Sequence, residues 1–262
     1  MSSIEIISNL STSNTKPPVL LIHGALFSAE TWRGNLLAYF QQQGFDTHAL
    51  SLRGHGNSKG GLRSASLDDY IQDVLNVIAC FDQPPILIGH SMGGLITQQI
   101  LIKQAVSGAV LVASIPPYGA IKSLMRFARD DTLSLSKMLG VWLYPKMRYW
   151  AQHPSGIFGH NVKQHQIDMS LSHMQAESIR VLADISVRKT PKNLNPHNTP
   201  IYCTGFSDDR LVYPEDVKKT AELFSAHYKI HSNLGHGFMY EEDWKLVAED
   251  INEWIHKNVL MK

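Results

Sequence analysis

The chain has 262 residues, of which 44% are hydrophobic and 18% are charged, and 24 Lys+Arg against 23 Asp+Glu give a net charge of +1. This composition excludes a disordered chain and argues against nucleic acid as the main partner, because nucleic-acid-binding domains usually carry a basic excess. No apolar run approaches the roughly 18 residues that a membrane-spanning helix needs. The N-terminus lacks the basic and long apolar regions of a secretory signal, which favours a cytoplasmic location.

The first half of the chain alternates short apolar runs with amphipathic stretches. The apolar runs predict strands over residues 18–22, 45–51, 85–89 and 108–113. The amphipathic stretches predict helices over residues 31–43, 67–81 and 92–104. Ser66 is a suitable N-cap for the second helix, and Gly44 stands where the first helix would end. Strands that alternate with helices of this length predict a mainly parallel sheet with helices on both faces.

The alternation stops between residues 116 and 198, where no comparable buried strand is found. This segment is rich in methionine and aromatic residues and predicts several helices. The alternation then resumes, with predicted strands over 200–204 and 228–232 and helices over 214–225 and 241–258. We therefore expect an α/β core made of residues 1–115 and 199–262, with a helical insertion over residues 116–198.

The sequence shows no sign of a disulfide framework or a metal site. Cys80 and Cys203 do not form a CxxC pair, and their apolar surroundings predict buried, reduced thiols. There is no H-E-x-x-H motif and no His-x-His cluster, so a metal-dependent enzyme is disfavoured. No metal ion and no cofactor are expected.

The most informative motif is Gly89-His90-Ser91-Met92-Gly93, which has the pattern G-x-S-x-G. By itself the pattern is weak, but here it lies directly after a predicted buried strand and directly before a predicted helix. This is the setting of a nucleophile elbow, a sharp turn that needs small neighbours around an exposed serine. The alternative is an ordinary strand-to-helix turn in which Ser91 has no role in chemistry.

A second turn, His23-Gly24-Ala25, follows an earlier predicted strand. Attack of a serine on an acyl carbon creates an oxyanion, which requires preorganised N–H donors. We expect these donors to be the backbone N–H groups of Met92, directly after the serine, and of Ala25. Without the elbow, the second turn would be read as the plain end of a strand.

A serine hydroxyl needs a general base, and the base needs an acid that orients it. Among 13 histidines, His236 stands in a glycine-flanked loop directly after a late predicted strand, at the same edge of the sheet as the elbow. For the acid, Asp208 and Asp209 are adjacent after the strand that ends near Thr204, and both remain candidates on position alone. The order serine, aspartate, histidine is that of the α/β-hydrolases.

The chain resembles the α/β-hydrolase family over nearly its whole length. The matching stretches are Leu21–Gly24, Leu52–Ser58, Gly89–Gly94, Asp209–Val212 and Gly235–Gly237. The resemblance favours Asp209 over Asp208 as the acid, since family members often carry the acid in a D-R-x-V run. It also implies that residues 116–198 form a cap, and that Arg53 and His55 support the fold rather than catalysis. The elbow is similar to that of monoacylglycerol lipases and lysophospholipases.

Together these features predict a serine hydrolase that cleaves carboxylic esters or thioesters of small to medium apolar acyl groups. Ser91, His236 and Asp209 would form its triad, and the substrate would be a small molecule. One alternative is a cofactor-free oxygenase or a lyase of the same fold, which would use the same side chains for proton abstraction. Another alternative is a ligand receptor that binds under the cap without turnover.

The near-zero net charge conceals an uneven distribution. Residues 116–198 contain 11 Lys+Arg against 5 Asp+Glu, a net charge of +6, and the rest of the chain therefore carries −5. A basic cap surface can simply be solvated. It can also attract anionic or amphiphilic substrates, because a surface of one sign raises the local concentration of opposite charge.

Overall fold

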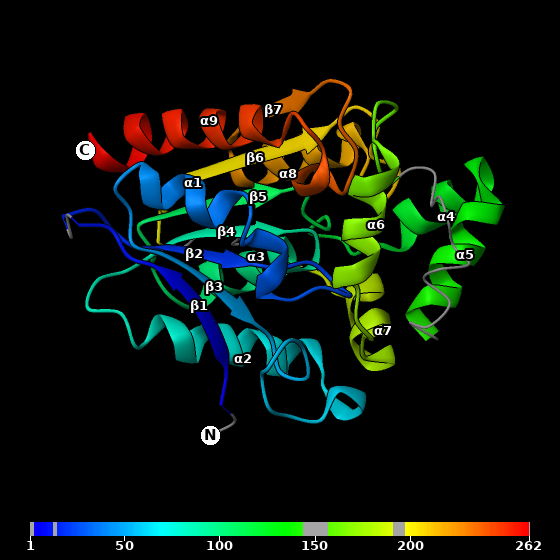
Figure 1. Cartoon of the computed structure of the whole chain (residues 1–262), viewed down its shortest axis with the longest axis horizontal. Coiled ribbons are helices and arrows are strands. Elements are labelled where there is room, and N and C mark those ends of the chain that lie inside the picture. The colour runs from blue at the N-terminus through cyan, green and yellow to red at the C-terminus, as the bar shows by residue number, and fades with distance from the viewer. Residues whose placement is uncertain (1–2, 13–14, 144–156, 191–196, 262) are drawn as a thin grey trace.

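A computed structural model describes residues 3–12, 15–143, 157–190 and 197–261 of the chain. Its centre is a seven-stranded sheet with the order β1-β3-β2-β4-β5-β6-β7 (Figure 1). The strands are β1 (Glu5–Asn9), β2 (Val19–Ile22), β3 (Thr47–Ser51), β4 (Ile86–His90), β5 (Gly108–Val112), β6 (Ile201–Phe206) and β7 (His227–His231). All neighbouring strands from β3 to β7 run parallel, and β1 pairs antiparallel with β3. The predicted α/β class with a mainly parallel sheet is confirmed.

The central strands are short continuous apolar runs because both of their faces are covered. Every residue of β2, β4, β5 and β6 is buried. By contrast, alternate residues of β1 are exposed, and its sequence was not recognised as a strand. An edge strand with one solvated face and polar residues lacks the continuous apolar run that marks strands buried on both faces.

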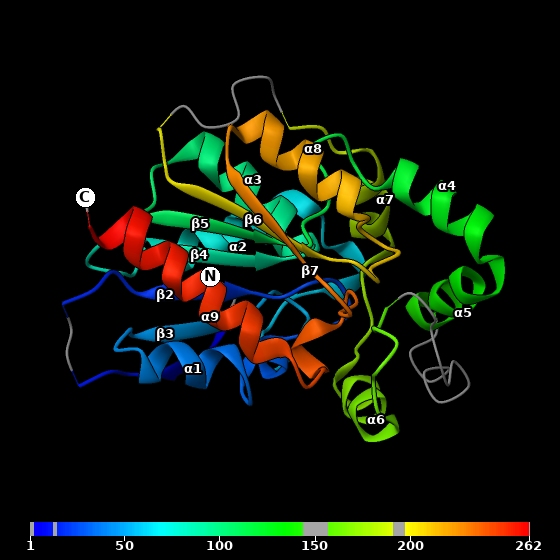
Figure 2. The same ribbon diagram turned by 90° about the horizontal axis from the view of Figure 1, so that it is seen from above.

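Helices cover both faces of the sheet (Figure 2). Helices α1 and α9 contact each other on one face, and α2 and α3 contact each other on the opposite face, which α8 also covers. Their bounds are α1 (Leu36–Gln42), α2 (Leu67–Ile78), α3 (Met92–Lys103), α8 (Pro214–Phe224) and α9 (Trp244–Ile255). Shorter helical turns are η1 (Ala29–Trp32), η2 (Leu62–Ser64), η4 (Phe238–Tyr240) and η5 (His256–Leu260).

The ends of two helices follow the chemistry of their terminal residues. The Ser66 side chain accepts a hydrogen bond from the Asp69 N–H and the Asp69 carboxylate accepts from the Ser66 N–H, so α2 begins with a capping box. The helix predicted over 31–43 is instead divided into η1 and α1. The division falls at Asn35, whose side chain accepts from the Leu36 N–H and starts α1 anew.

Residues 116–190 supply helices but no further strand of the sheet within the described ranges. They form α4 (Ile121–Asp130), α5 (Thr132–Leu143), α6 (Gln164–His173) and α7 (Ile179–Val187). We call these four the cap helices. They lie beyond the end of the sheet toward which the parallel strands point (Figure 1). The aromatic residues Tyr144, Tyr149 and Trp150, noted in the sequence, lie outside the described residues.

The two cysteines differ in exposure. Cys203 is buried in β6, as expected, and burial raises the pKa of its thiol to about 12. Cys80 is exposed, which contradicts the expectation, because it follows the last residue of α2 in a turn at the surface. Within the described residues, no helix is long and apolar enough to cross a membrane.

Candidate active site

Ser91 occupies a sharp turn between β4 and α3. Its backbone has φ 54° and ψ −114°, a conformation that residues other than glycine rarely adopt. The turn is tight because its glycines contact neighbouring backbone directly. A Cβ atom on Gly89 would lie 2.4 Å from the Gly93 carbonyl oxygen, and one on Gly93 would lie 2.3 Å from the Ile22 carbonyl oxygen. The small residues of the motif are therefore required by packing.

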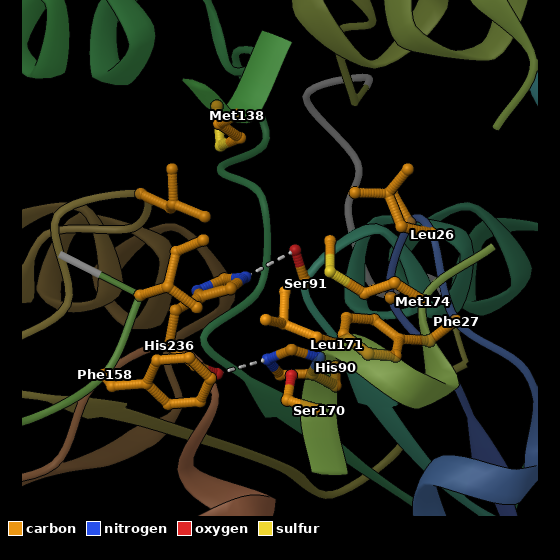
Figure 3. A pocket seen from close by; sticks show the side chains of 14 residues that line it. Leu26, Phe27, His90, Ser91, Met138, Phe158, Ser170, Leu171, Met174 and His236 are labelled. Carbon is orange, nitrogen blue, oxygen red and sulfur yellow. Dashed lines mark hydrogen bonds between the residues drawn. The ribbon is translucent and has the colours of Figure 1, made fainter. Parts of the chain in front are cut away.

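The structure brings the three predicted side chains into one chain of hydrogen bonds. The Ser91 Oγ lies 2.9 Å from His236 Nε2 (Figure 3). On the other side of the ring, His236 Nδ1 lies 2.7 Å from Asp209 Oδ2. The other carboxylate oxygen, Oδ1, accepts hydrogen bonds of 2.8 Å from the N–H groups of Leu211 and Val212. Asp209 is buried, and these donors fix the direction of its carboxylate. The imidazole can thus be held with Nδ1 protonated and Nε2 free to accept.

Asp208, the alternative acid, has other partners. Its Oδ2 lies 2.5 Å from His160 Nδ1 and also accepts from the His160 N–H, while its Oδ1 accepts from the Ser207 hydroxyl. His160 belongs to the segment that precedes α6 and is exposed. Asp208 therefore ties this segment to the core, and of the two aspartates the structure places only Asp209 against His236.

Two further histidines beside the site are buried and neutral. Burial and the nearby His236 keep the pKa of His90 well below its usual value, and its Nε2 lies 3.0 Å from the His236 carbonyl oxygen. Burial and the nearby His55 lower the pKa of His23 to about 3. The His23 ring accepts from the Leu52 N–H at Nε2 and lies 2.8 Å from the Gly24 carbonyl oxygen at Nδ1. A neutral ring with the proton on Nδ1 satisfies both of these contacts.

The two expected oxyanion donors lie beside the serine. Ala25 and Ser91 line the same two cavities, and Met92 is the first residue of α3. Neither the Ala25 N–H nor the Met92 N–H donates a hydrogen bond to any residue in the described part of the chain. Both groups are therefore available to a substrate oxygen.

A largely apolar cavity of about 590 Å³, open to solvent, leads to Ser91 (Figure 3). Phe158 lies on the side of His236, while Phe27 and Met174 lie on the opposite side, and Met138 stands apart from these on a cap helix. Leu26, Ile157, Leu211 and Leu171 of α6 also belong to the apolar part of the lining. The cap helices thus contribute side chains to the cavity.

A second cavity of about 500 Å³ lies on another side of Ser91. Its lining shares Ala25, Ser91 and Leu211 with the first cavity. The remaining lining is almost wholly apolar and comes from Ile115, Pro116, Ala120, Leu124, Ile185, Ser186 and Val212. None of the described residues that line either cavity is Lys, Arg, Asp or Glu. Two apolar cavities therefore meet at the serine.

Arg53 and His55 make contacts that support the fold. The Arg53 guanidinium binds Asp73 at 2.7 Å and Asp69 at 2.8 Å, which ties the loop after β3 to α2. The His55 ring is completely buried, 5.2 Å from the His23 ring between centroids. Neither residue lines a described cavity.

One buried residue beside the site had no signal in the sequence. Glu177, in the segment between α6 and α7, accepts a hydrogen bond of 3.2 Å from the Leu26 N–H, next to Ala25. No motif surrounds it, and a lone glutamate in an irregular segment is usually solvated. Only the fold shows that it is buried.

Among the described residues, no group of three His, Cys, Asp or Glu side chains is arranged to hold a metal ion.

Comparison with known proteins gives partial matches to curated sequences and complete matches to solved folds. Protein phosphatase methylesterase 1 of Bos taurus is 40% identical over 85 residues, which is 30% of this chain and 22% of that protein. The curated relatives that match are covered over only 2% to 29% of their own length.

Two solved structures have a similar fold along almost the whole chain. A thermophilic esterase from Thermogutta terrifontis superposes with a TM-score of 0.73 at 18% identity, covering 98% of this chain and 94% of the esterase. A bromoperoxidase from Bacillus anthracis superposes with a TM-score of 0.75 at 18% identity, covering 97% and 95% of the two chains. The model of the alpha/beta hydrolase family matches residues 19–250. The chain therefore belongs to the alpha/beta hydrolase family.

Proposed function

We propose that the protein hydrolyses uncharged carboxylic esters or thioesters whose acyl group is small to medium in size and apolar. The observation that carries this proposal is the chain of hydrogen bonds from Ser91 through His236 to Asp209. Ser91 lines two cavities, and the described residues around both cavities include no Lys, Arg, Asp or Glu. This arrangement joins a nucleophile, a base and an orienting acid within hydrogen-bond distance. The esterase-like relatives agree with hydrolysis as the reaction class.

In the first half of the proposed reaction, Ser91 Oγ attacks the carbonyl carbon while His236 Nε2 takes the hydroxyl proton. The carbonyl π electrons move to the oxygen, and the N–H groups of Ala25 and Met92 stabilise the resulting oxyanion. When the oxyanion collapses, the bond to the alcohol or thiol breaks and His236 gives its proton to the leaving group. Asp209 stabilises the imidazolium without taking its proton. The product is an acyl group bound to Ser91.

In the second half, water replaces the alcohol or thiol in the site. His236 accepts a proton from the water, whose oxygen attacks the acyl carbon. A second oxyanion forms at the same N–H groups and collapses to release the carboxylic acid, and His236 returns the proton to Ser91. Atoms and charges balance with water as the only co-reactant.

The two cavities suggest how an ester would be bound. An ester carbonyl at Ser91 has an acyl group on one side and an alcohol group on the other, and the two cavities meet at this point. Burying a charge in an apolar cavity without a partner is costly, so both linings favour uncharged groups. They give no support to the alternative in which the basic segment over 116–198 selects anionic substrates.

The test is a series of p-nitrophenyl and ethyl esters of increasing acyl length. Half-esters of dicarboxylic acids, whose acyl chain ends in a carboxylate, serve as the charged counterparts. We expect kcat/KM to be highest for uncharged acyl groups and to fall at least tenfold when the same acyl chain ends in a carboxylate. Equal kcat/KM for neutral and charged pairs would contradict the proposed substrate class. No hydrolysis of any ester, thioester or lactone would contradict the proposed reaction.

Each cavity can also be filled separately. Leu171→Trp narrows the first cavity and Leu124→Trp narrows the second. Each variant should therefore hydrolyse esters more slowly when either the acyl group or the alcohol group is long, but not both. Measured on esters lengthened in either the acyl or the alcohol group, the two variants should show opposite preferences. If both variants responded in the same way to both series, the two cavities would not bind the two halves of the ester.

The bromoperoxidase of similar fold points to a rival activity. Assays with hydrogen peroxide and bromide, with and without a carboxylic acid, separate the two. We expect ester hydrolysis in the absence of peroxide to be the faster reaction. Bromination without measurable ester hydrolysis would favour the rival activity.

A further inference from the structure

The carboxylate of Glu177 is buried against the loop that carries one proposed oxyanion donor. Its side chain has no exposed surface. Oε1 accepts from the Tyr70 hydroxyl at 2.7 Å and from the Ser178 N–H at 2.8 Å, while Oε2 accepts from the Leu26 N–H at 3.2 Å. Burial alone would raise the pKa of Glu177, but His55, the Tyr70 hydroxyl and the Ser178 N–H hold it below its usual value. Three hydrogen-bond donors thus fix both oxygens of a carboxyl group that lies inside the protein.

Both the N–H group and the carbonyl group of Leu26 bind the segment that contains Glu177. Its N–H donates to Glu177, and its carbonyl oxygen accepts a hydrogen bond of 2.7 Å from the Gln175 N–H. Leu26 has φ 70°, in the left-handed region that a leucine rarely occupies. A leucine keeps this conformation only where its surroundings hold it there. Residues 175–177 supply that restraint.

The direction of the Ala25 N–H depends on the two peptide groups around Ala25. The first peptide group contains the Gly24 carbonyl, which His23 Nδ1 contacts at 2.8 Å. The second contains the Leu26 N–H, which Glu177 holds at 3.2 Å. With both peptide groups held, neither can rotate without losing a buried hydrogen bond. The anchor at Gly24 comes from the core, and the anchor at Leu26 comes from the segment between two cap helices.

The segment that contains Glu177 is itself fixed to the loop after β3. The Gln175 side chain accepts a hydrogen bond of 2.9 Å from the Gly56 N–H. His55 Nε2 lies 3.3 Å from Glu177 Oε2. The Gly54–Ser58 loop and Tyr70 of α2 thus surround the carboxylate from the core side. The bond from the Gln175 N–H to the Leu26 carbonyl and the bond from Gly56 to Gln175 hold this segment beside Leu26 independently of the Tyr70 contact.

We propose that Glu177 is a positioning residue, whose carboxylate keeps the Leu26 N–H in place and thereby directs the neighbouring Ala25 N–H toward the substrate oxyanion. Glu177 lines neither cavity and does not touch the reacting atoms. Its contribution is expected in the transition state, where the oxyanion forms, and not in binding of the uncharged ester. This inference rests on the proposed ester hydrolysis.

The test compares Glu177→Gln with Tyr70→Phe. The glutamine side chain keeps the size of glutamate but has one acceptor oxygen, so an N–H₂ group must face either the Leu26 N–H or the donors at Oε1. Tyr70→Phe removes one hydrogen bond from Oε1 and leaves the bond between Oε2 and Leu26 intact. It is therefore a matched control for the general loss of a buried hydrogen bond.

We expect Glu177→Gln to lower kcat by about 10- to 100-fold with KM within about twofold of the original value, somewhat less than the loss of a whole oxyanion donor. The affinity for a trifluoromethyl ketone, which mimics the tetrahedral intermediate, should weaken by a similar factor. Tyr70→Phe should keep kcat and this affinity within about twofold. Should Glu177→Gln not fold, Glu177→Asp, which keeps the charge but shortens the side chain, replaces it with the same expectation.

Unchanged kcat in a folded Glu177 variant would overturn the inference. A decrease in kcat that Tyr70→Phe shares to the same extent would also overturn it, because that result would indicate general loosening. In both cases the original chain would still hydrolyse esters, so the proposed function would stand. If the original chain hydrolysed no ester, the proposed function itself would fail.

Discussion

At the scale of single residues, the two oxygens of Asp209 have different tasks. Oδ2 faces His236, whereas Oδ1 is held by the backbone N–H groups of Leu211 and Val212. The adjacent Asp208 points to His160 at the surface instead. Neighbouring residues of the same type are thus distinguished by the turn after β6, which sends one side chain inward and the other outward.

This difference predicts the outcome of two matched substitutions. Asp209→Asn keeps the shape of the side chain but cannot favour the imidazolium or the productive His236 tautomer, and we expect kcat to fall by about 10⁴-fold. Asp208→Asn should change kcat by less than about fivefold. Steady-state ester hydrolysis measures both values. Comparable losses in both variants would contradict the assignment of Asp209.

The sequence identified residues whose role follows from local context. Ser91 and His236 each stand in a short motif at the end of a strand, so position along the chain was sufficient. Position left Asp208 and Asp209 equivalent, and only the resemblance to the family favoured one of them. Glu177 could not be found at all, because it contacts Leu26, which is 151 residues away in the sequence.

At the scale of elements, the active-site turn depends on how closely α3 approaches the sheet. α3 begins directly after Ser91, and its second residue, Gly93, packs against the end of β2. The hydroxyl of Thr97 also donates to the Gly93 carbonyl oxygen at 2.9 Å. No space remains for a side chain at position 93, so the glycine sets the distance between helix and strand.

Gly93→Ala is therefore expected to destabilise the fold. The added Cβ would lie 2.3 Å from the Ile22 carbonyl oxygen, so either the helix or the strand must move. Overpacking of this kind costs about 1–3 kcal/mol in the free energy of unfolding. Gly34→Ala is the control, because an added Cβ there meets no atom within 4 Å. Urea unfolding of both variants measures the difference, and equal stabilities would contradict the close packing at Gly93.

Burial explains which strands are easiest to predict, although β7 was predicted despite its largely exposed residues. Strands buried on both faces, such as β4 and β5, are continuous apolar runs and can be recognised directly. β1 has alternate exposed residues and was missed. The division between η1 and α1 was missed as well, since the apolar spacing continues through it and the change depends on the side chain of Asn35. The spacing of apolar residues indicates which side of an element is buried, but it does not indicate where a capping side chain begins a new helix.

At the scale of the whole molecule, the site lies between the edge of the sheet and the cap helices. The sheet supplies Ser91, His236 and Asp209 from loops after three strands, and residues 116–190 supply Met138, Ile157, Phe158, Leu171 and Met174 to the apolar lining. Buried polar groups connect the two parts, including the Glu241 carboxylate, which accepts from the N–H groups of both Gly159 and Gly235. Burial raises the pKa of this carboxyl group. The mainly parallel sheet with flanking helices was predictable from the sequence, whereas these connections were not.

Buried histidines should make the stability of the whole molecule depend on pH. His23 has a folded pKa of about 3, below its ordinary value of 6.5. The unfolded chain therefore binds a proton at this position that the folded chain does not, and its contribution to stability falls as pH decreases from 6.5 toward 3. Between pH 7 and pH 5.5 this amounts to about 1 kcal/mol in the free energy of unfolding.

His23→Gln tests this expectation. Glutamine can replace the donor to Gly24 and the acceptor from Leu52 but does not titrate. Denaturant unfolding at the two pH values should show a smaller loss of stability for the variant than for the original chain, by about 1 kcal/mol. Equal losses would mean that His23 is already protonated in the folded state or does not contribute.

In the proposed mechanism, Ser91 attacks the substrate with the help of His236 and Asp209. The most direct measurement is reaction with an alkyl fluorophosphonate, followed by mass spectrometry of the modified peptide and by ester hydrolysis of Ser91→Ala. We predict one adduct per chain with loss of fluoride, located on Ser91, and loss of hydrolysis by at least about 10⁴-fold in a folded Ser91→Ala variant. An adduct on another residue, or hydrolysis by Ser91→Ala at the original rate, would contradict the mechanism.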